Sequence, residues 1–335
     1  MPDAHAEPPP LAIGDPSDYV VLFFDFMGQR EYLKQWEEMA SQCSFDAQKQ
    51  WQPRNPAGLV DAVQKSAFVI AELLDITRTE LLGKLIYQKL NVPSDFQLKS
   101  IQFSDTIVFY GKMEAKGNVG NLGIFLINSA MLVASSVMFN SLRLKAPARG
   151  AITIGSAVEG LWRAGSAGMA TVPSIIPQNV ENFFYGPVFE RAYDLENSIA
   201  DYPRILVDWS VLNYLQCARQ AVDKGLNLDN NYRTMMDDAL GRLPGGIDAD
   251  EQEGPHGFRV LDWAGKYFYN KTTQPCQRKL FAKQLHEALD FAKQVQTASA
   301  SNHAQTGDLA QLKVAGKYAR LVHYLEPRLA LWTAD

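Results

Sequence analysis

Cysteine is scarce in this chain of 335 residues, and a strong excess of charge of either sign is missing. The three cysteines, Cys43, Cys217 and Cys276, are far apart and form no CxxC pair, which argues against a disulfide framework and a structural zinc site. A formal net charge of −5 without any run of Lys or Arg gives no electrostatic footprint for nucleic acid or an anionic membrane. We therefore expect a reducing, cytoplasmic location, and any polyanionic ligand must be held locally.

The sequence also lacks the short motifs of several large enzyme classes. GxxxxGK(S/T), GxGxxG and GxSxG do not occur, so P-loop, dinucleotide-binding and α/β-hydrolase mechanisms have no support. The histidines show neither i, i+4 pairing nor HExxH, which removes support for a histidine zinc site. Residues 1–17 have no basic start and no apolar stretch, and they predict a flexible tail instead of a signal peptide.

One long stretch without charged residues, from Asn118 to Leu142, has the length of a membrane span. Asn and Ser side chains interrupt it repeatedly, and no basic cluster marks one flank. We therefore expect a buried helix at about 120–140, either central in the core or facing a second copy of the chain.

Strand and helix patterns alternate along the chain before about residue 210 and become mostly helical after it. Short β-rich runs predict strands at 19–26, 96–103, 106–112, 149–160, 203–209 and 258–263. Helical spacing of apolar residues predicts helices at 29–42, 59–90, 186–200 and 210–240, with an acidic loop at 243–257. The alternation predicts an α/β layered fold, with a core at 18–215 and a mainly helical elaboration at 216–335 packed on it.

The segment around Asp25 combines features that suit a triphosphate. Asp25 lies near the end of the first expected strand, at 19–26, and Gly28 opens the following helix. A metal ion can take the Asp25 carboxylate and the Phe26 carbonyl together with phosphate oxygens, while backbone amides receive the anionic tail. Those amides belong to Met27, Gly28, Gln29 and Arg30.

A second carboxylate, Asp105, lies in the turn between two expected strands of a hairpin. Either aspartate alone is compatible with a structural role, as a helix cap or a turn residue. Two carboxylates on adjacent central strands can also bind two divalent ions, one activating a hydroxyl and one holding the triphosphate. The pair therefore indicates phosphoryl transfer with two Mg²⁺ or Mn²⁺ ions, with Asp25, Phe26 and Asp105 as metal ligands.

Four segments resemble, in order, the motifs of class III nucleotidyl cyclases, the adenylate and guanylate cyclase superfamily. FFDFMGQ is similar to FxDIxGFT, and FSDTIVFYG is similar to the family's GD hairpin, with Ser104 in place of Gly. RGAITIG resembles RxGIHxG with one extra residue between the glycines, and FYGPVFERAYDLE resembles WGxxVNxAxRLE. The resemblance covers about residues 19–208 and implies a ferredoxin-like core with an antiparallel-centred sheet and added C-terminal helices.

The last segment departs from the family at two functional positions. The family's Asn and Arg, which position the ribose and stabilise the transition state, are replaced by Glu190 and Asp194. Arg149 or Arg191 could supply the cation that the developing charge on the α-phosphate requires, and the sequence leaves both open. Should no Arg reach the site, the chain would be an inactive, nucleotide-binding scaffold with a cyclase fold.

Base recognition departs from the family as well. Ile101 and Phe183 occupy the positions of the family's purine-reading residues, and neither can make those hydrogen bonds. Stacking by Phe103, Phe183 or Tyr185 is the functional alternative to a role in the core. A divergent core that lacks the purine-reading residues and carries added C-terminal helices resembles the pyrimidine cyclases of bacterial Pycsar anti-phage systems.

That resemblance implies conversion of UTP or CTP to 3′,5′-cyclic UMP or cyclic CMP and pyrophosphate, with uridylate cyclase favoured. It also implies an anti-phage signal read by a separate effector protein, and a head-to-tail homodimer with active sites at its interface. A purine (adenylate) cyclase and the inactive scaffold remain alternatives. A diguanylate-cyclase-like reaction is disfavoured because no GGDEF-type sequence occurs.

Overall fold

The computed structural model describes residues 12–13, 16–27, 43–45, 51–53, 71–72, 75, 97–103, 106–113, 120–162, 181–244, 254, 256–272 and 274–334. The expected helix at 29–42 lies outside these residues, as does nearly all of the periodic segment at 59–90.

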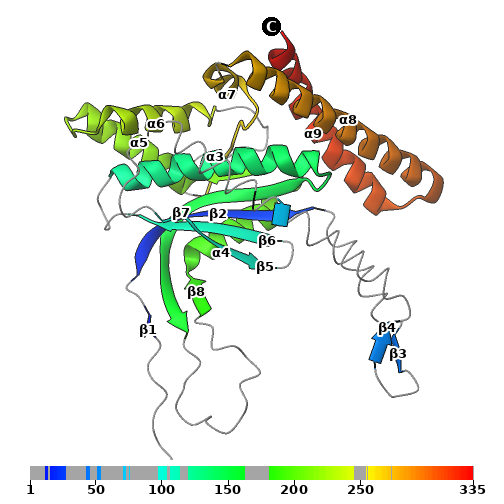
Figure 1. The fold of residues 1–335 in the computed structure, drawn as a ribbon, viewed down its shortest axis with the longest axis horizontal. Helices are drawn as coiled ribbons and strands as arrows, with labels where there is room; N and C mark the ends of the chain where they lie inside the picture. Colours follow the sequence, from blue (N-terminus) through cyan, green and yellow to red (C-terminus); the bar gives the residue numbers. More distant parts are fainter. Residues whose placement is uncertain are drawn as a thin grey trace, which may run out of the picture.

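A mixed sheet forms the centre of the molecule (Figure 1), with strands in the order β10-β9-β7-β2-β6-β5. In that order they are Phe258–Val260, Ile205–Asp208, Ala148–Trp162, Ser17–Phe26, Thr106–Lys112 and Lys99–Phe103. Every pairing along this path is antiparallel except β7 with β9. The strands β7, β2, β6 and β5 are fourth, first, third and second along the core, which is the ferredoxin-like order. The predicted α/β fold with an antiparallel-centred sheet is confirmed.

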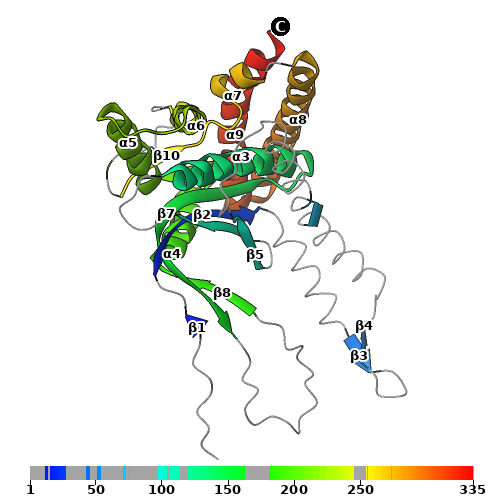
Figure 2. The same ribbon diagram turned by 60° about the vertical axis from the view of Figure 1, so that its left-hand side comes forward.

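The outer half of β7 carries two further strands. β8 (Glu181–Tyr185) pairs with residues 158–162 of β7, and β1 (Ala12–Ile13) pairs with Leu161 and Gly160. Figure 2 shows this arm extending from the sheet away from the helices α3 and α8. A separate two-stranded sheet consists of β3 (Cys43–Phe45) and β4 (Trp51–Pro53).

The two faces of the sheet have different covers because side chains alternate along a strand. Val20, Leu22 and Phe24 of β2 lie in the main core cluster, under helix α3 (Asn121–Arg143). Val21 and Phe23 point to the opposite face, which helix α4 covers. We call this second face the Asp25 face, because Asp25 has the same parity.

Helix α3 is the uncharged segment, and it lies inside the protein. Every residue from 122 to 142 is buried, so the helix meets the length and hydropathy of a membrane span while packing entirely within the described part of the chain. Two of its polar side chains bond to the preceding turn: Ser135 Oγ donates to the Met131 carbonyl at 2.9 Å, and Asn140 Nδ2 donates to the Ser136 carbonyl at 2.9 Å. The prediction of a buried central helix is confirmed.

On the Asp25 face, the expected single helix at 186–200 is two different helices. An α-helix, α4 (Pro187–Asp194), continues directly into a π-helical turn, η1 (Leu195–Ile199). The wider turn shifts the side chains that follow Asp194 relative to a continuous α-helix. One buried carboxylate, Glu196, is placed in this way.

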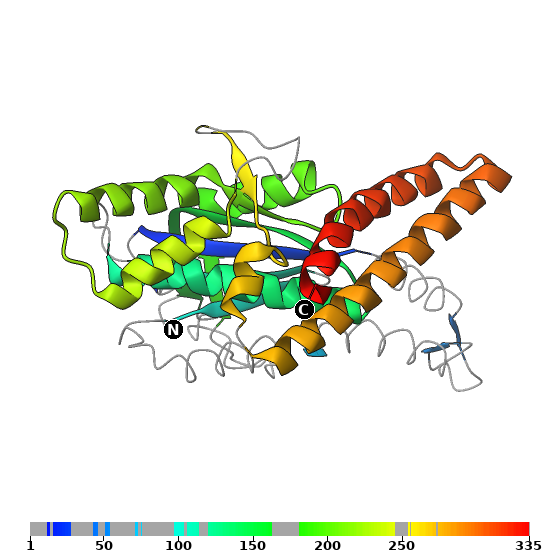
Figure 3. The ribbon, with the colours of Figure 1, turned by 90° about the horizontal axis from the view of Figure 1, so that it is seen from above.

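The C-terminal part is mainly helical and packs on α3. It contains α5 (Trp209–Asp223), α6 (Asn230–Gly241), α7 (Lys266–Lys271), α8 (Pro275–Thr306) and α9 (Leu309–Thr333). The strand expected at 203–209 ends at Asp208, because that side chain caps α5 by accepting from the Ser210 amide at 3.1 Å. Figure 3 shows α8 and α9 as a long antiparallel hairpin over one end of the sheet, near the end of β2.

Asp262 anchors the α8/α9 hairpin to the core. Its Oδ1 accepts from Arg328 Nε at 3.1 Å, from Arg328 Nη2 at 3.0 Å and from the Tyr324 hydroxyl at 3.0 Å. Trp332 Nε1 adds a bond of 2.8 Å to the Ala264 carbonyl. One buried aspartate after β10 therefore holds the end of α9 in place.

Candidate functional site

Asp25 and Arg149 face each other at one end of the sheet. Asp25 is the last residue but one of β2, and its register partners are Thr106 on β6 and Arg149 on β7. Directly paired residues project to the same face of a sheet. Arg149 Nε and Nη2 each donate to Asp25 Oδ2 at 3.1 Å. Only 17% of the Asp25 side chain is exposed, so this carboxylate is partly desolvated yet open to a ligand.

Arg149 is held from a second direction by the π-helical turn. Its Nη1 donates to the Ala200 carbonyl at 3.2 Å, and its Nε lies 2.6 Å from Glu196 Oε1. The Glu196 side chain is only 3% exposed. One guanidinium therefore serves two carboxylates, Asp25 at the open end of the strand and Glu196 inside.

Two glycines of the cyclase-like motifs allow this close packing. A Cβ atom on Gly150, next to Arg149, would lie 2.2 Å from the Phe23 carbonyl oxygen of β2. A Cβ atom on Gly186, between β8 and α4, would lie 2.6 Å from the Ala157 Cα and from the Ser156 carbonyl oxygen. Backbone atoms occupy the space that a side chain would need at each position, so the close packing of these strands requires glycine at both.

The other candidate residues on α4 and β8 point elsewhere. Arg191 Nε and Nη2 donate to Asp208 Oδ1 at 3.0 and 2.8 Å, which directs Arg191 to the start of α5. Glu190 and Asp194 are exposed on α4, and Tyr185 on β8 is 66% exposed. Within one chain, the structure thus brings Arg149 to Asp25 and pairs Arg191 with a different carboxylate.

Several predicted site residues cannot be placed. Asp105, Gly28, Gln29 and Arg30 lie outside the described residues, and so do the side chains of Phe103 and Phe183. Thr106, which follows Asp105 in the sequence, pairs with Asp25.

The two described residues that follow Asp25 offer backbone groups to a ligand. The Phe26 side chain is 1% exposed and belongs to the α3 side, so its carbonyl is the group available for a metal ion. The Met27 amide, expected to bind phosphate, donates to the Pro147 carbonyl at 2.8 Å.

The oxygen donors at this end suit a hard divalent cation. Carboxylate and carbonyl oxygens are the ligands that Mg²⁺ and Mn²⁺ prefer. In the described residues no group of three or more His, Cys, Asp or Glu side chains is close enough to hold a metal. Asp25 and the Phe26 carbonyl therefore fit part of such a site, and Arg149 shares the Asp25 carboxylate with it.

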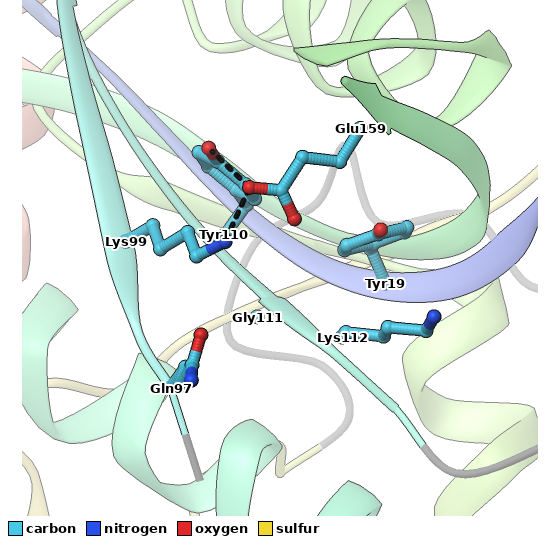
Figure 4. Close-up of a pocket in the computed structure, with 7 residues that line it drawn as sticks. All are labelled: Tyr19, Gln97, Lys99, Tyr110, Gly111, Lys112 and Glu159. Atoms are coloured by element: carbon cyan, nitrogen blue, oxygen red, sulfur yellow. Dashed lines mark hydrogen bonds and ion pairs between the residues drawn. The ribbon is translucent and has the colours of Figure 1, made fainter. Parts of the chain in front are cut away.

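A polar cavity of about 220 Å³ lies on the Asp25 face, near the other end of β2 (Figure 4). Its lining residues are Tyr19, Gln97, Lys99, Tyr110, Gly111, Lys112 and Glu159. The Lys99 ammonium forms an ion pair with Glu159 Oε1, and the Tyr110 hydroxyl donates to the same oxygen at 3.5 Å. This cavity offers a cation, a carboxylate and aromatic rings within one small space.

Aromatic side chains form one wall of this cavity. The ring of Phe184 stacks on Tyr110, with centroids 4.2 Å apart, and meets Tyr19 edge-on at 5.1 Å. Burial, followed by the negative charge of Glu159, raises the pKa of Tyr110 to about 12 and also raises the pKa of Tyr19. Both hydroxyls therefore stay protonated at neutral pH as hydrogen-bond donors.

Sequence reasoning missed this cavity. Its residues come from four strands and the segment just before β5, and they include Glu159 near the end of a long β-rich run. The signal in the sequence that could have indicated this cavity is Lys99, which is two residues before Ile101 and therefore lies on the same face of the strand.

No protein-family model matches the chain, and no curated protein matches it. Among solved structures, the adenylyl cyclase CyaB from P. aeruginosa is similar over 75% of this chain and 96% of that chain, with 11% identity and a TM-score of 0.36. A bacterial light-regulated adenylyl cyclase matches over 76% and 95%, with 10% identity and a TM-score of 0.38. The dimeric guanylyl cyclase domain of the RhoGC fusion protein from the aquatic fungus Blastocladiella emersonii matches over 75% and 97%, with 10% identity and a TM-score of 0.35. Scores this low assign no family, so the function must be argued from the residues.

Proposed function

We propose that this protein is a metal-dependent nucleotidyl cyclase that converts a pyrimidine nucleoside triphosphate, UTP or CTP, into its 3′,5′-cyclic monophosphate and pyrophosphate. The observation that carries the proposal is the pairing of Asp25 with Arg149 at the open end of the central strand. An oxygen ligand for a metal ion and a guanidinium for phosphate oxygens then lie within 3.1 Å of each other. Asp25 and Arg149 come from two of the four cyclase-like motifs, and the fourth motif reaches the same end of the sheet with Glu196.

In the proposed reaction, the ribose 3′-oxygen forms a bond to the α-phosphorus while the bond from that phosphorus to the bridging oxygen of the pyrophosphate breaks. The 3′-hydroxyl proton is released to solvent, and pyrophosphate leaves. Asp25, the Phe26 carbonyl and Asp105 would hold Mg²⁺ or Mn²⁺, which would supply Lewis acidity to the 3′-hydroxyl and positive charge to the phosphates. Arg149, held in place by Glu196 and Ala200, faces the charge that develops on the α-phosphate.

The cavity around Lys99 and Glu159 is the proposed base site. A stacking wall, one cation and one carboxylate can bind the Watson–Crick edge of a pyrimidine, with Glu159 accepting from a ring or exocyclic N–H and Lys99 donating to a carbonyl. Ile101 and Phe183 at the purine-reading positions favour a pyrimidine over a purine. UTP remains the first choice, as the sequence resemblance implies.

The two ends of this proposed site do not meet within one chain. Tyr19 at the cavity and Asp25 are six residues apart on one strand, which is roughly 20 Å. That length exceeds the distance from the base of a bound nucleotide to its α-phosphate. The proposal therefore includes a head-to-tail homodimer, in which the cavity of one protomer faces Asp25 of its partner.

A nucleotide-binding scaffold without turnover is the second candidate. The observation in its favour is that Arg149 and Arg191 both already form ion pairs with carboxylates of the chain. Such a protein would bind a triphosphate and release no cyclic product.

The deciding experiment incubates the purified chain with ATP, GTP, CTP and UTP in Mn²⁺ and identifies the products by mass spectrometry. We expect cyclic UMP or cyclic CMP from the wild type and none from Asp25→Asn or Asp105→Ala. Asp290→Asn, on an exposed position of α8, is the matched control and should retain activity. Binding of a triphosphate without any product would favour the scaffold, and a cyclic purine product would overturn the pyrimidine assignment.

A further inference from the structure

Helix α9 carries a basic stripe that faces the Asp25 end of the sheet. Lys313, Lys317 and Arg320 are spaced i, i+4 and i+7, so they lie along one side of the helix. The stripe belongs to the C-terminal hairpin, outside the segments that carry the cyclase-like motifs. The proposed reaction assigns no role to these three residues.

Arg320 fixes the position of this stripe. Its Nη1 donates to Asp201 Oδ2 at 2.8 Å. Asp201 directly follows Ala200, whose carbonyl accepts from Arg149 Nη1 at 3.2 Å. Arg320 and Arg149 therefore bond to two consecutive residues, Asp201 and Ala200, which places this side of α9 beside Arg149.

Lys317 lies one turn before Arg320 and extends the stripe toward the Arg149 and Asp25 pair. Its side chain is half-buried, and burial lowers its pKa, as does the nearby charge of Arg149, while Asp201 and Asp25 oppose that shift. Lys317 is three residues before Arg320, whose guanidinium bonds Asp201, so it lies within about one helical turn of that contact. Figure 3 shows the hairpin over this end of the sheet.

The charges gathered here do not balance. Asp201 already pairs with Arg320 and with Arg204, and Arg149 already serves Asp25 and Glu196. Among the described residues of this cluster, the cations outnumber the carboxylates Asp25, Glu196 and Asp201 by two; the cations are Arg149, Arg204, Lys313, Lys317 and Arg320. The proposed metal ligand Asp105, which lies outside the described residues, would leave one positive charge in excess, in a protein whose net charge is −5. Such a local surplus favours a ligand with several negative charges.

We infer that α9 supplies an anion subsite for the polyphosphate tail of the nucleotide, with Lys317 as its central group and Lys313 at its rim. This inference rests on the proposed function and deepens it, since the tail of a triphosphate bound at Asp25 must find cations nearby. A lysine suits this role because its ammonium group binds phosphate oxygens as a mobile point charge. The hairpin must be docked for the subsite to form, so the C-terminal elaboration becomes part of substrate binding.

The test measures binding of inorganic tripolyphosphate to the full-length protein by calorimetry, with and without Mg²⁺. We expect the wild type to bind and Lys317→Met to bind about ten-fold more weakly, which is the loss of one charge-assisted contact. Lys317→Arg should restore most of the affinity because it retains the charge. Lys279→Met, an exposed residue of α8 near the other end of the hairpin, should bind like the wild type.

Equal affinity of Lys317→Met and the wild type overturns the subsite, and so does a wild type that does not bind tripolyphosphate. The melting temperatures of the variants show whether each is folded, and Lys313→Met gives an independent, smaller decrease in affinity. Because the probe has neither base nor ribose, the result is separate from the cyclase assay. If tripolyphosphate binding depends on Lys317 but the protein makes no cyclic nucleotide, the subsite stands and the cyclase proposal is rejected. If Lys317→Met is an active cyclase with an unchanged KM, only the subsite is rejected.

Discussion

At the scale of single residues, Arg149 connects the open carboxylate of Asp25 to the buried carboxylate of Glu196. Both partners lose a cation when Arg149 is removed, and a buried charge without its partner is strongly destabilising. We expect Arg149→Met to lower the free energy of unfolding by about 3 kcal/mol or more. Cyclic product should fall at least about a hundred-fold, as for loss of a transition-state contact. Denaturant unfolding and the cyclase assay measure the two effects.

The double variant Arg149→Met/Glu196→Gln separates these two roles. Neutralising Glu196 removes the unpaired buried charge, so stability should recover in part. Activity should not recover, because the guanidinium is still absent. Recovery of both together would mean that Arg149 acts on activity only through folding.

A second prediction at this scale concerns Tyr110, whose pKa is raised to about 12 by burial and by Glu159. In the unfolded chain a tyrosine loses its proton near pH 10. The folded state therefore holds more protons between pH 10 and 12, and stability should fall as pH rises through this range. Tyr110→Phe should reduce the pH dependence of the free energy of unfolding there. An ultraviolet titration should also lose one late tyrosine.

Tyr318 provides the control, because burial alone raises its pKa to about 12 as well. Glu159→Gln should lower the pKa of Tyr110, because it removes the nearby negative charge. Tyr318→Phe should remove a different late tyrosine and leave the titration of Tyr110 unchanged. A Tyr110 that titrates near pH 10 in the folded protein would contradict its buried position beside Glu159.

At the scale of elements, the position of the α8/α9 hairpin depends on Asp262. Asp262→Asn removes the charge that Arg328 pairs with and weakens a bond from Tyr324. We expect a loss of about 1.5–3 kcal/mol in the free energy of unfolding, typical of hydrogen bonds to charged groups. Limited proteolysis within 275–334 should become faster. Lys293→Gln, which breaks the exposed ion pair with Glu326, should change stability by about 1 kcal/mol or less.

The π-helical turn shows how an element boundary decides a contact. A continuous α-helix from 187 to 199 would rotate Glu196 relative to its observed place against Arg149. The turn also directs the Ala200 carbonyl to the same guanidinium. Local backbone geometry, and not residue type alone, assembles the support for Arg149.

At the scale of the whole molecule, the separation of the cavity from Asp25 predicts complementation between inactive variants. Asp25→Asn and Glu159→Gln should each be inactive alone, since each variant damages both sites of its own dimer. After exchange of protomers, half of the dimers would be mixed, and each mixed dimer would have one intact site. Activity should return to about a quarter of the wild type. The cyclase assay on mixed proteins measures this recovery.

Asp25→Asn mixed with Arg149→Met is the matched control. Both changes lie at the same end of the sheet, so no mixed dimer would have an intact site. Recovery in this mixture, or no recovery in the first, would contradict a site shared between protomers. Light scattering at the assay concentration should show a dimer.

The sequence alone was enough to predict the layered fold, the buried strand that carries Asp25 near its end, the hairpin of β5 and β6, and the buried helix α3. These features depend on local periodicity and on composition, which are visible along the chain. Arg149 was also recognised as a candidate, through a motif, although the choice between it and Arg191 stayed open. Within the chain, the register of β2 and β7 sets Arg149 opposite Asp25, while Asp208 holds Arg191.

Only the tertiary structure shows the contact of Glu196 with Arg149, the cavity of Lys99 and Glu159, and the docking of α9 beside Asp201 through Arg320. Each joins residues that are distant in sequence, and their meeting depends on strand register, on one π-helical turn and on where a long hairpin docks. No local pattern carries that information, because it arises from packing between elements. Residue chemistry thus indicated which groups could act, and the fold decided which of them meet.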